Sequence, residues 1–72
     1  MSLDGGSSVT INGEPRRASA GVSLAELLAE IGVDPARVAV ERNRVIVARS
    51  TFGEVIVADG DRYEIVHFVG GG

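Results

Sequence analysis

One segment of the chain has apolar residues at helical spacing. Four of them fall at positions i, i+3, i+4 and i+7, on one face of a helix: Leu24, Leu27, Leu28 and Ile31. Ser23 and Glu26 have the S-x-x-E spacing of a capping box, in which each side chain bonds an amide of the first turn. Gly32 suits the left-handed conformation that ends many helices. The sequence therefore predicts an amphipathic helix between Ser23 and Gly32.

The remaining apolar residues alternate with polar ones or form short β-branched runs, as in strands. The predicted strands cover residues 9–11, 14–20, 38–41, 45–47 and 63–69. Asn12 and Gly13 favour a two-residue hairpin turn between the first two strands. Because Pro15 lacks an amide hydrogen, the second strand is expected at a sheet edge.

Two connections differ in how clearly they are encoded. The run Asp59-Gly60-Asp61 is typical of a tight turn before the last strand. Residues 49–58 are ambiguous, because Ser50 or Thr51 could cap a helical turn and residues 55–57 could extend a strand.

The order of these elements predicts an α+β fold, with a mixed sheet packed on one main helix. The first and last strands are expected to be parallel neighbours in the middle of the sheet, joined through a crossover that contains the helix. We expect three parts: a flexible N-terminal segment (residues 1–8), a folded domain (9–69) and a flexible glycine tail (70–72).

Composition narrows the possible functions. The 72-residue chain has no cysteine and one histidine, which argues against a disulfide framework and a histidine-rich metal site. A net charge of −3 argues against nucleic-acid binding. No apolar run approaches the roughly 18 residues of a membrane span, and no signal peptide is evident, so we expect a soluble cytoplasmic protein without a membrane partner.

The most distinctive chemical group is the carboxylate of Gly72, at the end of the glycine run that follows the last strand. Gly70 and Gly71 lack a Cβ atom, so they could let the tail enter a narrow cleft of another protein. Composition alone fits an unstructured terminus equally well. His67 has no evident nucleophile or orienting group nearby in the sequence, and we interpret it as a surface residue.

The last strand also predicts a docking surface. If Tyr63 and Ile65 face the helix, Val66 and Phe68 lie on the opposite face, next to the tail. Together with Val69 they are candidates for partner docking. Cover by a loop or by a second copy of the chain is the alternative.

These pieces, in this order, resemble the ThiS family of sulfur carrier proteins in thiamine (thiazole) biosynthesis. The resemblance covers residues 9–72 and includes Asn12-Gly13, Ser23-Leu24-Ala25-Glu26-Leu27-Leu28, Val38-Ala39-Val40-Glu41-Arg42-Asn43, Asp59-Gly60-Asp61 and the terminal Gly-Gly. It implies the β-grasp fold of ubiquitin. Gly70 departs from the family, which more often has a larger residue at that position.

The resemblance implies a carrier and not an enzyme. A separate E1-like, ThiF-type enzyme would adenylate Gly72 with ATP, a thiocarboxylate would form with a sulfur donor, and a ThiG-type thiazole synthase would receive the sulfur. No cofactor would be bound by this chain. Two alternatives stay open: a sulfur carrier for molybdopterin or cysteine synthesis, and a ubiquitin-like modifier or interaction module.

Overall fold

The computed structural model describes residues 6–68 of the chain. Within that range there are five strands, one α-helix and two short 3-10 helices. The strands are β1 (Ser7–Ile11), β2 (Glu14–Ala18), β3 (Val38–Arg42), β4 (Val45–Ile46) and β5 (Arg62–His67). The helices are α1 (Leu24–Glu30), η1 (Pro35–Arg37) and η2 (Arg49–Thr51). Residues 1–5 and 69–72, which include most of the predicted N-terminal segment and the whole glycine tail, lie outside the described residues.

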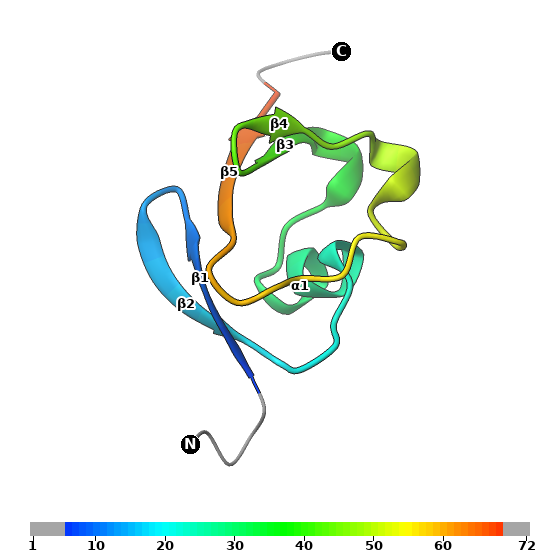
Figure 1. Cartoon of the computed structure of the whole chain (residues 1–72). Helices are drawn as coiled ribbons and strands as arrows, with labels where there is room; N and C mark the ends of the chain where they lie inside the picture. The colour runs from blue at the N-terminus through cyan, green and yellow to red at the C-terminus, as the bar shows by residue number, and fades with distance from the viewer. Residues whose placement is uncertain (1–5, 69–72) are drawn as a thin grey trace.

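The five strands form one mixed sheet in the order β2-β1-β5-β3-β4. β1 and β5 are parallel, with Thr10 opposite Arg62, whereas the other neighbouring pairs are antiparallel. In Figure 1, β5 runs between the β1–β2 hairpin and the β3–β4 hairpin, and α1 lies across one face of the sheet. The predicted α+β fold, the parallel central pair and the edge position of the strand with Pro15 are confirmed.

The helix forms as its local sequence predicts. The Ser23 hydroxyl accepts a 3.1 Å hydrogen bond from the Glu26 amide, and the Glu26 carboxylate accepts a 2.9 Å bond from the Ser23 amide. Gly32 follows the helix with a φ of +79°, which a residue with a Cβ rarely adopts. The apolar face packs on the sheet in a core of twelve buried residues: Val9, Ala18, Val22, Leu24, Leu27, Leu28, Val38, Val40, Phe52, Val57, Tyr63 and Ile65.

Several strand boundaries differ from the prediction by one or two residues. β1 begins at Ser7, two residues earlier than expected, because its first residues pair with the end of β2. β2 ends at Ala18 instead of residue 20. β5 starts at Arg62 and ends at His67.

The ambiguous segment becomes η2 followed by an extended stretch. Within that stretch, Ile56 forms an isolated antiparallel bridge with Ser23, the residue that caps the start of α1, and the stretch is not one of the strands of the sheet. Carbonyls between η2 and this bridge cap the helix: the amides of Leu24 and Ala25 donate to the carbonyls of Val55 and Phe52 at 2.8 and 2.9 Å. The helix start and residues 52–57 therefore hold each other in place.

Candidate functional site

The end of β5 is the described part of the chain nearest in sequence to the glycine tail. Tyr63 and Ile65 are buried beneath the helix, whereas Val66 and Phe68 keep 61% and 59% of their surface exposed. His67 is also exposed. The predicted site residues Val69, Gly70, Gly71 and Gly72 lie outside the described residues.

Val66 is an exposed apolar side chain on the sheet face that points away from the helix. It lies directly opposite Ala39 of β3, whose neighbours Val38 and Val40 point into the core. We call Ala39, Val66 and Phe68 the exposed apolar patch. Exposed apolar patches are typical of surfaces that bind other proteins.

Acidic residues lie next to this patch. Glu41 and Glu64 are directly opposite each other on β3 and β5, on the same face as Val66. Like charges opposite each other in a sheet are destabilising, so a partner with basic side chains would relieve the repulsion. The face therefore combines apolar surface with negative charge.

A buried polar network lies at the other end of β5, and the sequence analysis missed it. Asp61 is 5% exposed, and its carboxylate accepts four hydrogen bonds of 2.8–3.2 Å from Arg42 Nε, Asn43 Nδ2, the Tyr63 hydroxyl and the Ala58 amide. The Arg42 side chain is only 33% exposed and forms an ion pair with Asp61.

The network shifts two pKa values in opposite directions. Burial alone would raise the pKa of Asp61, but the hydrogen bonds from Ala58, Tyr63, Asn43 and Arg42 outweigh it and lower the pKa below 3.8. Burial, with the neighbouring Asp61 carboxylate, raises the pKa of Tyr63 well above its usual value. Asp61 is thus an ionised acceptor that fixes the start of β5, a structural role.

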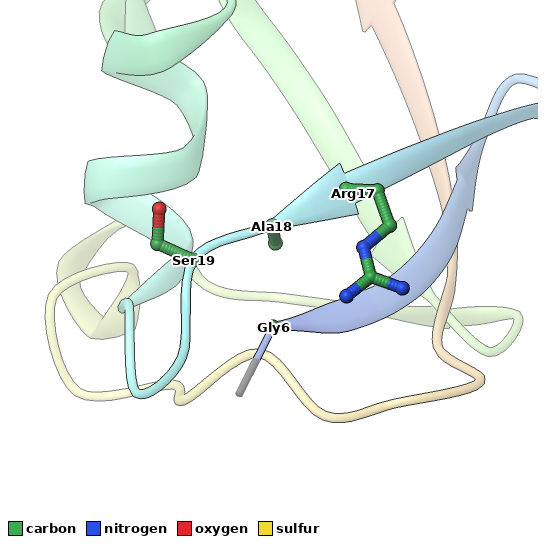
Figure 2. Close-up of a pocket in the computed structure, with 4 residues that line it drawn as sticks. All are labelled: Gly6, Arg17, Ala18 and Ser19. Carbon is green, nitrogen blue, oxygen red and sulfur yellow. The ribbon is translucent and has the colours of Figure 1, made fainter. Parts of the chain in front are cut away.

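The described residues offer little other chemistry. In residues 6–68 no group of three or more His, Asp or Glu side chains is placed to hold a metal ion. A shallow pocket lined by Gly6, Arg17, Ala18 and Ser19 lies where β1 begins and β2 ends (Figure 2), and the Ser19 hydroxyl there points away from Arg17. In the same range, no helix is both long and apolar enough to cross a membrane.

Comparison with known proteins identifies the family. The sequence model of the ThiS family matches residues 9–72, nearly the whole chain. The chain belongs to the ThiS family. A crystal structure of a thiamine biosynthesis protein (ThiS) from Geobacter metallireducens superposes with a TM-score of 0.77 at 32% identity, over 90% of this chain and 99% of that one. The fold is therefore the β-grasp fold that the resemblance implied.

Two kinds of curated relatives are similar in sequence. The sulfur carrier protein ThiS of Bacillus subtilis (strain 168) is 44% identical over 50 residues, which are 69% of this chain and 76% of that protein. The thiazole synthases of Magnetococcus marinus and Paramagnetospirillum magneticum are 48% and 53% identical over 64 residues, 89% of this chain. The chain spans only 20% of the length of each thiazole synthase.

Proposed function

We propose that this chain is a sulfur carrier of thiamine biosynthesis, and that its Gly72 carboxylate carries the sulfur as a thiocarboxylate. The observation that carries the proposal is the match to the ThiS family through the terminal glycines. The exposed end of β5, three residues before Gly70, supports it because a tail that leaves the domain there would start at the surface. On this proposal the chain is a substrate of other enzymes and catalyses nothing itself.

Two steps would install the sulfur. A carboxylate is a poor electrophile, so an oxygen of Gly72 first attacks the α-phosphorus of ATP, which forms an acyl adenylate and releases pyrophosphate. Hydrosulfide (HS⁻) from a sulfur donor then attacks the carbonyl carbon, AMP leaves with the electron pair of the C–O bond, and loss of the S–H proton yields the thiocarboxylate. A ThiF-type activating enzyme would bind the ATP, for which this sequence has no G-x-x-x-x-G-K-[ST] phosphate loop, and would use the sulfur donor. Gly70 and Gly71 would thread through the enzyme's cleft.

Docking of the activating enzyme would use the exposed apolar patch, extended by Val69. The apolar side chains would supply the contact area, and Glu41 and Glu64 would select a basic rim on the partner. We place these encounters in the cytoplasm, because a chain without cysteine forms no disulfide bond and so needs no oxidising compartment.

A charge placed in the patch should weaken docking and leave the fold intact. We expect Val66→Asp to raise the Kd for the activating enzyme about tenfold or more, because an acidic group would be desolvated beside Glu41 and Glu64. Since Val66 is already 61% exposed, the melting temperature should change little. Calorimetric titration with the activating enzyme measures the Kd.

Val45→Asp is the matched control. Val45 is 67% exposed, but it pairs with Arg42, two residues from Val40, and so lies on the other face of the sheet. Equal weakening by both variants would contradict docking at this patch.

The partner that receives the sulfur separates thiamine synthesis from the other sulfur pathways. The two relatives named thiazole synthases, in which the matching segment is a fifth of the protein, support a ThiG-type thiazole synthase as that partner. In a reconstituted reaction, the thiocarboxylated chain should support thiazole formation, and the unmodified chain should not. Failure with thiazole synthase, together with transfer to a molybdopterin precursor, would instead assign the chain to the alternative pathway.

A further inference from the structure

We infer that Arg49 is a positioning residue that fixes the backbone and the ring of Phe68, the last described residue before the glycine tail. The inference rests on the proposed function, because a fixed exit matters only if the tail is delivered into another protein's active site. It assigns a role in presenting the tail to a residue that is far from the tail in sequence.

Arg49 joins both ends of the turn that holds Phe68. Its Nε donates a 2.8 Å hydrogen bond to the carbonyl of Pro35, and its Nη2 donates a 3.0 Å hydrogen bond to the carbonyl of Val38. Between these two residues, the carbonyl of Arg37 accepts a 2.9 Å bond from the Phe68 amide. The guanidinium therefore braces the backbone segment that anchors the end of β5.

Arg49 also lies over the side chain of Phe68. Its guanidinium carbon is 5.7 Å from the centre of the Phe68 ring, within the range of a cation–π contact. The ring of Phe68 thus contacts Arg49 directly, and its amide bonds a carbonyl in the segment that Arg49 braces. Phe68 is 59% exposed, so burial in the core does not fix it.

A fixed exit would favour docking by preorganisation. If the last residues before the tail already point in one direction, less conformational freedom is lost when the tail enters the activating enzyme. Without the brace, the residues before the tail must be ordered when the carrier binds, so the KM of the activating enzyme for the carrier should rise. The bound tail is the same in both cases, so kcat should be nearly unchanged. A lysine would keep the positive charge, but it lacks the planar fork that reaches two carbonyls at once.

The kinetic test uses pyrophosphate release by the activating enzyme, with the carrier as the varied substrate. We expect Arg49→Ala to raise KM about three- to tenfold, with kcat within about twofold of the wild type. Arg49→Lys should give an intermediate KM. Arg16→Ala removes the same charge from an exposed position on the edge strand β2 and should leave KM unchanged. An unchanged KM in Arg49→Ala would overturn the inference. A wild-type KM in Arg49→Lys would also overturn it, because a positive charge at this position would then be enough.

Amide hydrogen exchange tests the brace without any partner. In Arg49→Ala the Phe68 amide should exchange about three- to tenfold faster, while the Ile65 amide, held by the Asn12 side chain at 2.7 Å, keeps its rate. If the wild-type chain is not adenylated at all, the proposed function fails. An unchanged Phe68 exchange rate in a chain that is adenylated normally overturns only the role of Arg49.

Discussion

We expect Asp61→Ala to lower the free energy of unfolding by about 2–4 kcal/mol. The change leaves the Tyr63 hydroxyl and the Ala58 amide without their acceptor in a site where Asp61 itself is only 5% exposed. It also removes the ion-pair partner of Arg42. For a domain of this size the melting temperature should fall by roughly 10–30 °C, measured by circular dichroism.

Asp59→Ala is the control in the same turn. Asp59 is exposed, and its carboxylate accepts one 2.7 Å hydrogen bond, from the Ser8 amide. Its loss should cost about 0.5–1.5 kcal/mol at most. Similar losses in the two variants would mean that the Asp61 network adds nothing beyond an ordinary turn.

The lowered pKa of Asp61 makes this stabilisation depend on pH. Because the carboxyl loses its proton more readily in the folded state, its contribution is full above its ordinary pKa of 3.8 and is lost as the pH falls through the lower folded value. The stability difference between the wild type and Asp61→Asn should therefore be constant near neutral pH and shrink below about pH 4. Denaturant titrations at several pH values measure it. A difference that persists unchanged into strong acid would contradict the network.

Deleting Gly72 should abolish most adenylation without affecting the fold. Removal of one residue retracts the carboxylate by about 3.5 Å, and a displacement of about 1 Å at a reacting group can cost about a hundredfold in rate. We therefore expect kcat/KM for adenylation to fall about a hundredfold or more. Gly71 would still end the chain with a glycine carboxylate, so the loss would come from reach and not from a change of functional group.

Two substitutions of the full-length tail complete this test. Gly71→Ala and Gly72→Ala keep the reach but add a Cβ atom that a narrow cleft would exclude. Both should impair adenylation and retain the melting temperature of the wild type. Normal adenylation in both variants and in the deletion would contradict the role of the glycine tail.

The elements that sequence predicted best are those encoded by neighbouring residues. Ser23, Glu26 and Gly32 define the ends of the helix within ten positions, and the structure has each contact or backbone angle. The turn at Asn12 and Gly13 likewise depends only on the positive φ values of two adjacent residues, +51° and +84°. Local signals of this kind need no knowledge of the rest of the fold.

Contacts between distant residues were not predictable in the same way. Asp61 was interpreted as a turn residue, because its partners Arg42 and Asn43 are 19 and 18 positions away in the sequence. The Asn12 side chain also bonds both the amide and the carbonyl of Ile65, 53 residues away. An Asp that follows a turn and precedes a buried Tyr is a weak hint of such a network.

The candidate site was predicted in part for the same reason. Alternation along β5 correctly placed Tyr63 and Ile65 in the core and left Val66 and Phe68 exposed. The brace by Arg49 could not be inferred, because it joins three segments that only the folded chain brings together. The docking role of Val66, Phe68 and Val69 stays a prediction.

The most direct measurement is the intact mass of the chain ending at Gly72 after incubation with a ThiF-type activating enzyme, ATP and a sulfur donor. The proposed function predicts a mass gain equal to the replacement of one oxygen by one sulfur, which fragmentation locates at Gly72 and which is absent without ATP. As a positive control, the activating enzyme must modify its own carrier under the same conditions. If it does and the mass of this chain is unchanged, the proposed function is contradicted. Attachment of the chain to lysines of other proteins, without sulfur, would identify a modifier instead.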